Sequence, residues 1–333
     1  MNIINFLSLS ADKLSEMGNF PPQQIMDPEN QHLYIPVRRS QINFYREVPL
    51  YYQPSTDRYA LYKPPGKIVA DLRINESRYP KLYISQENRI QAIIELQKGF
   101  NRHIAENIES GNVMEVKTTL CNLVEETLAE PRSGTLRALP ETVNTLVSGY
   151  SRHPDVLNTF AYISLKDYTT VIHSVNVMAL TIGFCFYEKY SIQETKRLSL
   201  SALLHDVGKT EIPENILKSP RKLTDREFKI MKSHTKIGGD IIRDKSGIDD
   251  DIARGALEHH EKLDGSGYPN GSRVISFEGQ LLGIIDCYEA LTNEDRPYRR
   301  AKDPLETLKF LKQDVEAGKF NRKLFEKFCF SLI

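Results

Sequence analysis

The pattern of apolar and polar positions changes near residue 86, where short runs give way to helical spacing. Before that point, Pro and Gly separate short runs that contain Tyr and Val, a pattern typical of strands and turns. From about Gln86 the apolar residues recur every three or four positions, beginning with Ile90, Ile93 and Ile94, which predicts helices. The runs with strand character are LYIPV (33–37), INFYREVPLYYQ (42–53), RYALYKPPGKIVADLRI (58–74) and KLYIS (81–85).

These two patterns predict an α+β protein with three parts. We expect a small α/β module over residues 1–87, a helical connector over 88–134 and an all-helical domain over 135–333. The connector has apolar stripes that fit dimerisation, although ordinary interdomain packing explains them equally well. The module offers no catalytic cluster, and a regulatory or sensor role for it rests on analogy alone. Its tyrosines most simply pack a small sheet; they are Tyr45, Tyr51, Tyr52, Tyr59 and Tyr62.

Composition narrows the class of protein. The 44 basic and 44 acidic residues balance, which argues against a dedicated nucleic-acid binder. The four cysteines are far apart and form no CxxC pair, so a reducing cytoplasm is the simplest compartment. The N-terminus lacks the basic and apolar regions of a signal peptide. The longest apolar stretch, near Val177–Tyr187, is too short and mixed to span a bilayer. We therefore expect a soluble cytoplasmic protein without a membrane partner.

The histidines gather on the apolar sides of predicted helices. Five of the eight lie between residues 173 and 260, and two acidic residues, Asp206 and Asp286, sit in similar surroundings. One buried histidine is most often a core residue with satisfied ring nitrogens. Five of them with two acids would be costly to bury without a metal that removes the cost. The histidines are His173, His205, His234, His259 and His260.

Such a set predicts a metal site with nitrogen and carboxylate ligands. This donor set suits iron, manganese or another borderline divalent ion, and does not suit a closed structural zinc site. Among these ions we expect iron, with manganese next. Seven ligands are too many for one ion that also binds substrate, so we expect two ions that share the carboxylate of Asp206. Two such ions can hold a bridging hydroxide and clamp a phosphoryl group. Lys209 lies one turn after His205 and can meet phosphate charge, or it is a solvated lysine at a helix end.

The ordered series of motifs resembles the HD-GYP family within the HD phosphohydrolase superfamily. The resemblance covers about residues 150–310 and rests on the ordered spacing, because an HD pair alone is a weak signal. The matching segments are YTTVIHSVNV (168–177), HDVGK (205–209), IPENILKSPRKLTDREFKIMKSHTKIG (212–238), HHEKLDGSGYP (259–269) and DCYEALTNEDRPYR (286–299).

The resemblance implies an all-helical domain and a role for each motif residue. One metal would be held by His173, His205, Asp206 and Asp286, and the second by Asp206, His234, His259 and His260. The resemblance implies that Lys209, Arg296 and Arg299 bind phosphate. Gly267, Tyr268 and Pro269 would shape the substrate mouth without touching metal.

Three departures from the family pattern refine this expectation. Thr169 stands where members with a third metal carry glutamate, which predicts two metals. The stretch from Pro269 to Asp286 is slightly shorter than usual, and that from Asp286 to Arg296 is one residue longer. These two changes affect the expected substrate geometry and leave the metal ligands in place.

The leading hypothesis is a phosphodiesterase that hydrolyses cyclic di-GMP to pGpG and then towards GMP, with Asp206 and Lys209 as catalytic residues. One alternative is a metal-loaded but inactive module that binds cyclic dinucleotides or docks a signalling protein at its GYP face. Another is a hydrolase of a different nucleotide, such as cyclic GMP-AMP. For Glu261, the best hypothesis is a hydrogen bond to a ligand histidine.

Overall fold

The computed structural model of the chain describes residues 33–55, 58–69, 80–129, 131, 135–160, 169–244, 248–292 and 303–332. The chain divides into two compact units, Met1–Gly99 and Phe100–Ile333. The division falls inside helix α2 (Arg89–Glu109), about three turns after the module boundary expected from the sequence.

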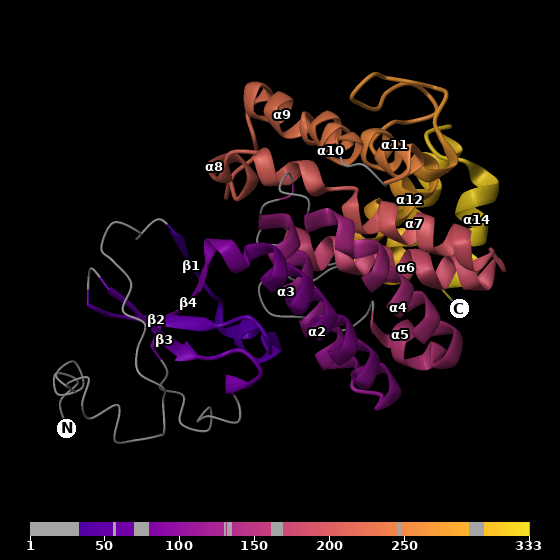
Figure 1. The fold of residues 1–333 in the computed structure, drawn as a ribbon. Helices are drawn as coiled ribbons and strands as arrows, with labels where there is room; N and C mark the ends of the chain where they lie inside the picture. The colour runs from indigo at the N-terminus through magenta and orange to yellow at the C-terminus, as the bar shows by residue number, and fades with distance from the viewer. Residues whose placement is uncertain are drawn as a thin grey trace, which may run out of the picture. The chain divides into compact units, whose positions relative to one another are not determined.

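The N-terminal unit contains a four-stranded antiparallel sheet in the order β1-β4-β2-β3 (Figure 1). Its strands are β1 (Tyr34–Pro36), β2 (Leu50–Ser55), β3 (Arg58–Lys63) and β4 (Leu82–Ser85). Tyrosines contact one another across the strands: the Tyr34 and Tyr59 rings stack at 4.0 Å, and Tyr83 meets Tyr59 edge-on at 5.1 Å. Cross-strand aromatic pairs stabilise such a sheet, as the tyrosine pattern predicted.

The expected strand over 42–53 begins later than its apolar pattern indicated. Residues Arg39–Phe44 form a 3-10 helix, η3, and β2 starts only at Leu50. The Gln41 side chain accepts a hydrogen bond from the Arg38 backbone N–H at 3.1 Å and holds this turn. Local side-chain bonds of this kind compete with strand pairing. Part of the run expected at 58–74, residues 70–79, lies outside the described residues.

The rest of the described chain is helical, as the spacing predicted. Its longer helices are α2, α3 (Val113–Ala129), α4 (Leu139–Arg152), α6 (Thr170–Tyr187), α7 (Ile192–Leu204), α12 (Phe277–Thr292) and α13 (Pro304–Glu316). Its shorter helices are α5 (Pro154–Phe160), α8 (Glu214–Leu217), α9 (Asp225–Lys232), α10 (His234–Arg243), α11 (Asp250–Glu258) and α14 (Arg322–Ser331). Three 3-10 turns complete the series: η6 (Gln86–Asn88), η8 (Thr135–Ala138) and η9 (Val207–Glu211).

Four helices, α6, α7, α11 and α12, pack against one another at the centre of the helical unit (Figure 1). One cluster of buried apolar side chains joins them to α3 and α4; Val116, Leu120 and Val143 belong to it. Polar caps fix where the helices begin, because the Thr169 side chain accepts from the Ile172 N–H and Ser191 forms a capping box with Glu194. A further capping box, formed by Thr224 and Glu227, is present at the start of α9.

Helix α6 is longer than the apolar stretch noted in the sequence. Its 18 residues have a mean hydropathy of 1.5, which by length and composition alone meets the requirement for a membrane span. However, 72% of this helix is buried inside the protein, and it carries the buried polar residues His173 and Asn176. Its apolar character therefore follows from its central place in the core.

Candidate metal centre

The centre is built around His205 and Asp206, where α7 ends and η9 begins. Both side chains are buried, with exposed fractions of 0% and 2%. Gly208 allows this turn to lie directly against α10, because a Cβ at residue 208 would lie 2.0 Å from the His234 carbonyl oxygen. The glycine of HDVGK thus brings two predicted ligands, His205 and His234, into one site.

Three of the imidazole rings are oriented by backbone carbonyls. In each, Nδ1 lies close to the carbonyl three residues earlier: His205 to Ala202 at 2.7 Å, His234 to Met231 at 2.7 Å and His259 to Ala256 at 2.9 Å. A carbonyl only accepts hydrogen bonds, so Nδ1 carries the proton and Nε2 has the free lone pair. Metal-binding histidines are commonly fixed in this way.

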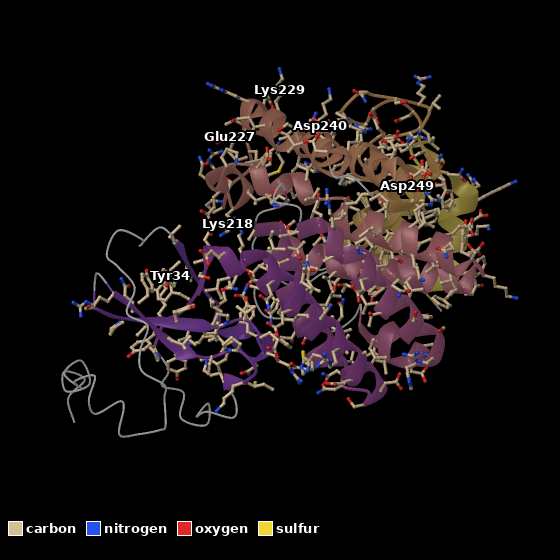
Figure 2. All side chains as sticks on the ribbon, in the orientation of Figure 1. Tyr34, Lys218, Glu227, Lys229, Asp240 and Asp249 are labelled. Carbon is tan, nitrogen blue, oxygen red and sulfur yellow. The ribbon has the colours of Figure 1, made fainter. Side chains whose placement is uncertain are left out.

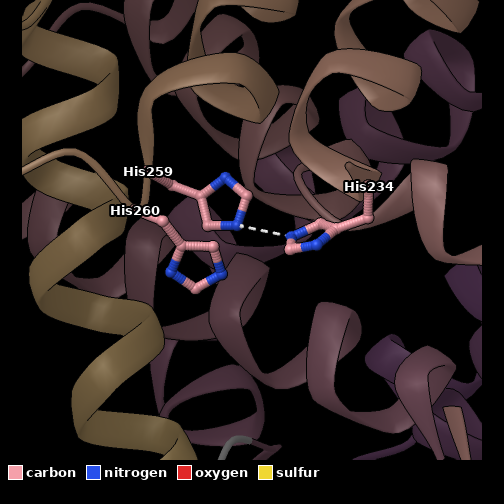
Figure 3. Close-up of side chains that lie close together, drawn as sticks. All are labelled: His234, His259 and His260. Atoms are coloured by element: carbon pink, nitrogen blue, oxygen red, sulfur yellow. Dashed lines mark hydrogen bonds between the residues drawn. The ribbon is translucent and has the colours of Figure 1, made fainter. Parts of the chain in front are cut away.

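The lone pairs of His234 and His259 face each other. Their Nε2 atoms are 3.4 Å apart (Figure 3). Because each Nδ1 already donates to a carbonyl, neither Nε2 can donate to the other in the neutral rings. Burial lowers the pKa of both rings, most strongly for His259, so protonation does not resolve the contact. A cation between the two nitrogens would convert this repulsion into coordination.

The Asp206 carboxylate lies between two groups of nitrogens. Its Oδ1 is 3.3 Å from Nε2 of His234 and 3.8 Å from Nε2 of His259. Its Oδ2 is 3.5 Å from Nε2 of His205 and 3.6 Å from Nε2 of His173. Buried Oδ1 has no hydrogen-bond partner among the described residues, and an orphaned buried acceptor of this kind is costly unless a cation meets it.

Asp286 on α12 also reaches both groups. Its Oδ1 is 3.0 Å from Nε2 of His173, and its Oδ2 is 3.8 Å from Nδ1 of His260. The sequence had associated Asp286 with the first group only. All seven predicted ligands therefore meet in one site. Six of them form two compact sets, His173–His205–Asp206 and His234–His259–His260, that could each hold an ion, and Asp286 lies between these sets.

Two further buried residues, which the sequence analysis missed, support His173. Glu289 Oε2 accepts a hydrogen bond from Nδ1 of His173 at 2.5 Å, and Oε1 accepts one from the Asn176 amide at 2.7 Å. The available signal was spacing, because Asn176 follows His173 by three positions and Glu289 follows Asp286 by three. Lys117 of α3, fully buried, interacts electrostatically with Glu289, while its burial lowers the pKa of its ammonium group to about 8.

Charge in the centre is balanced by nearby cations. Burial alone would raise the pKa of Asp206, but the Lys209 ammonium and the imidazoles hold it well below its usual range. The Lys209 ammonium donates directly to Asp206 Oδ2. Burial likewise opposes protonation of His173, but Glu289 and Asp286 outweigh it and raise its pKa to about 9. This ring is therefore cationic at neutral pH in the metal-free protein.

The loop after His260 frames the centre. The Tyr268 ring lies 4.6 Å from the His260 ring and 6.4 Å from the His234 ring, measured between centroids. Gly267 permits a close backbone approach, since a Cβ there would lie 2.4 Å from the Lys262 nitrogen. Arg296 and Arg299 lie outside the described residues.

The hypothesis for Glu261 was wrong. Its buried carboxylate accepts hydrogen bonds from the backbone N–H groups of Asn270 at 2.7 Å and Ser272 at 2.9 Å. Glu261 lies before the Gly-Tyr-Pro segment and binds backbone groups that follow it, so it closes this loop and does not orient a histidine. The pattern was invisible in the sequence because backbone donors have no residue signature.

The described helices and their histidine–aspartate cluster define an HD-domain protein. The HD domain profile matches residues 163–324. A structure described as a HDG"Y"P protein from Bdellovibrio bacteriovorus covers 89% of this chain and 98% of its own, with a TM-score of 0.59 at 20% identity, which supports the fold. Because the HD and HH…GYP segments meet in one site, residues 163–324 form an HD domain of the HD-GYP type, and the resemblance seen in the sequence is confirmed.

Curated relatives match parts of the chain. A cyclic di-GMP phosphodiesterase of Pseudomonas aeruginosa is 31% identical over 190 residues, which are 56% of this chain and 45% of that protein. A cyclic di-GMP phosphodiesterase of Thermotoga maritima is 46% identical over 112 residues, 33% of this chain and 30% of that protein. A 3'3'-cGAMP-specific phosphodiesterase of Vibrio cholerae is 30% identical over 166 residues, 49% and 38% respectively. The chain thus spans less than half the length of these relatives.

Proposed function

We propose that the chain is a metal-dependent phosphodiesterase that hydrolyses cyclic di-GMP, first to pGpG and then towards GMP. The relatives from P. aeruginosa and T. maritima are named for this substrate. The observation that carries the proposal is the position of Asp206. Its two oxygens face separate groups of histidines, and Oδ1 has no hydrogen-bond partner in the part of the chain that the structure describes. A carboxylate so placed is suited to bridge two cations.

In this proposal the first ion is held by His173, His205, Asp206 and Asp286, and the second by Asp206, His234, His259 and His260. The distances of 3.0–3.8 Å between facing atoms within each set support this division. Divalent ions in such a site polarise a phosphoryl oxygen and make water a stronger nucleophile at neutral pH. We propose two ions, iron first and manganese next, because neutral imidazole and carboxylate suit both.

The chain's own residues have three roles in the proposed reaction. Lys209, whose side chain is 22% exposed, binds the negative charge of the phosphate at the edge of the centre. Arg296 and Arg299 bind phosphate from the neighbouring segment. Gly267, Tyr268 and Pro269 form the wall beside His260 and restrict how the substrate enters.

We further propose a cytoplasmic enzyme, since cyclic dinucleotides are intracellular signals. The same proposal assigns a regulatory role to residues 1–87, dimerisation to residues 88–134 and catalysis to residues 135–333. It also includes a signalling partner at the GYP face.

Turnover by the purified chain, loaded with iron or manganese, tests the function. We expect release of pGpG from cyclic di-GMP. Faster hydrolysis of 3'3'-cGAMP would favour the second substrate, which the V. cholerae relative makes a specific alternative. Tight binding without product would instead favour a binding module, and would overturn the proposed activity.

The Asp206→Ala variant tests the shared bridge. We expect metal content to fall from two ions to one or fewer per chain, and activity to fall by more than the roughly 10–100-fold typical of losing an outer-sphere partner. The matched control is Asp240→Ala on α10, whose carboxylate is 68% exposed and is labelled at the surface in Figure 2. Full metal content in Asp206→Ala would rule out the bridge.

A further inference from the structure

Helix α9 lies beside the centre without a place in the core. None of its eight residues is buried. It is held at its start, where Glu227 accepts from the Thr224 N–H at 2.8 Å and pairs with Arg221 at 2.7 Å (labelled Glu227, Figure 2). A short helix fixed in this way, with no buried face, can present its side chains to a ligand.

An aromatic path leads from this helix to the centre. The Phe228 ring, 45% exposed, meets the Tyr268 ring edge-on with centroids 6.4 Å apart. Tyr268 in turn lies 4.6 Å from the candidate ligand His260. Single exposed apolar residues are common on protein surfaces, but Phe228 is distinguished by its contact with Tyr268, which lies beside the candidate centre.

A cation lies over the same two rings. The Lys232 ammonium is 4.6 Å from the centroid of Phe228 and 5.2 Å from that of Tyr268. Lys232 is half-buried, whereas Lys229 on the same helix is exposed and labelled on its outer side in Figure 2. An exposed aromatic ring with an ammonium group beside it matches the two parts of a nucleotide, a flat base and a phosphate.

We propose that Phe228 stacks on a purine base of the substrate and that Lys232 binds the adjoining phosphate, so that α9 determines how the dinucleotide enters the centre. This proposal rests on the proposed function and adds residues that set substrate affinity. Stacking on an aromatic ring uses the face of a base and not its edge. The platform formed by Phe228 and Lys232 therefore accepts guanine and adenine alike.

Kinetics of Phe228 variants test the platform. Phe228→Ala and Phe228→Leu should each raise KM for cyclic di-GMP about tenfold, because base–aromatic stacking contributes at this scale, with kcat changed less than about twofold. Phe228→Trp, which keeps an aromatic ring at this position, should retain the wild-type KM. The matched control is Phe330→Ala on α14, where a comparably exposed ring (59%) lies on another helix and KM should stay unchanged. Because leucine keeps an apolar side chain at position 228, its result remains interpretable if alanine weakens the helix.

Lys232 has a matched control on its own helix. Lys232→Met should raise KM about five- to tenfold, and the effect should shrink as salt screens the phosphate contact. Lys229→Met removes an equivalent charge from the outer side and should leave KM unchanged. Equal effects of the two substitutions would reduce Lys232 to a contribution to net charge and would overturn its assigned role.

A tryptophan at position 228 gives a second readout that does not depend on turnover. The chain has no natural tryptophan, so Phe228→Trp introduces a single reporter. Cyclic di-GMP should quench its fluorescence, and 3'3'-cGAMP should quench it to a similar extent. Phe330→Trp should show no quenching. If neither nucleotide quenches the reporter at position 228, the platform is wrong.

The outcomes separate this inference from the proposed function. If the wild-type enzyme hydrolyses cyclic di-GMP but Phe228→Ala and Phe228→Leu keep its KM, only the platform fails. If the wild type does not hydrolyse cyclic di-GMP while the fluorescence of the Phe228→Trp variant is quenched, the proposed activity fails and the nucleotide platform stands.

Discussion

Glu289 Oε2 lies 2.5 Å from Nδ1 of His173, and both side chains are buried in the helical unit. This bond fixes the ring whose other nitrogen faces Asp206 and Asp286. A carboxylate behind a ligand histidine orients the ring and raises its basicity. Glu289 on α12 therefore supports the candidate centre through His173, without itself touching a reacting atom.

Replacing this carboxylate should weaken metal binding. For Glu289→Gln we expect metal affinity to fall roughly 10–100-fold, as is usual when an outer-sphere partner of a histidine is lost. Chelator competition measures the effect. Glu278→Gln is the matched control, because Glu278 is also buried on α12 but pairs with Arg197. Equal metal affinity of Glu289→Gln and wild type would contradict a positioning role.

Metal binding should release a proton from His173. Its pKa of about 9 in the metal-free protein means that the ring is protonated at pH 7, whereas burial lowers the pKa of His260 to about 3 and keeps that ring neutral. Below pH 9, metal affinity should therefore rise about tenfold per pH unit. Calorimetry in two buffers of different ionisation enthalpy should show about one proton released per chain at pH 7.

The same shift has a consequence for stability with a defined sign. Because the pKa of His173 is raised above 6.5, its contribution is complete below pH 6.5 and is lost as pH rises through about 9. The thermal midpoint of the metal-free protein should therefore fall as pH rises through about 9. A fall that occurs in the wild type and is missing in Glu289→Gln would identify His173 as its source.

Gly208 should be intolerant of any side chain. A Cβ there would lie 2.0 Å from the His234 carbonyl oxygen and 2.6 Å from the Gly238 nitrogen. Overpacking of this kind costs about 3 kcal/mol, so Gly208→Ala should lower the thermal midpoint by roughly 6–12 °C and reduce metal content. Gly239→Ala on α10 is the control, since its Cβ would meet no atom closer than 3.6 Å. A similar midpoint for both variants would contradict the close approach.

Glu261 should affect substrate binding more than metal binding. Glu261→Gln leaves one backbone N–H of the loop facing an amide donor, at a cost of about 1–3 kcal/mol. We expect KM for cyclic di-GMP to rise while the number of bound ions stays unchanged. Glu316→Gln, at a 54% exposed position, serves as control. Loss of metal in Glu261→Gln would restore the earlier hypothesis that Glu261 supports a ligand.

The sequence predicted the candidate metal ligands more completely than the residues that hold those ligands in position. His205 and His234 each lie at a helix end, where spacing on an apolar face placed them inward, and the structure brings both to Asp206. Glu289 was missed because its role depends on how α6 packs against α12, which no local pattern specifies. Glu261 was misassigned for a similar reason, since its partners are backbone N–H groups of residues 270 and 272.

In the N-terminal unit, composition predicted which segments form strands more accurately than it predicted where each strand begins and ends. Tyr51 pairs with Tyr83 as expected of neighbouring strands. The run from Ile42 was misread because Tyr and Val favour strands, whereas the Gln41 side chain closes a local turn. Weak propensities yield to such specific bonds.

The continuous core has a practical consequence for work with fragments. The matched HD segment begins at residue 163, yet Val116, Leu120 and Val143 pack in the same apolar cluster as the HD helices, and Lys117 faces Glu289. A fragment cut at residue 163 would retain every candidate ligand, uncover this apolar surface and remove a buried counter-charge. Domain swaps and truncations should therefore preserve residues from 100 onward, where the compact unit begins.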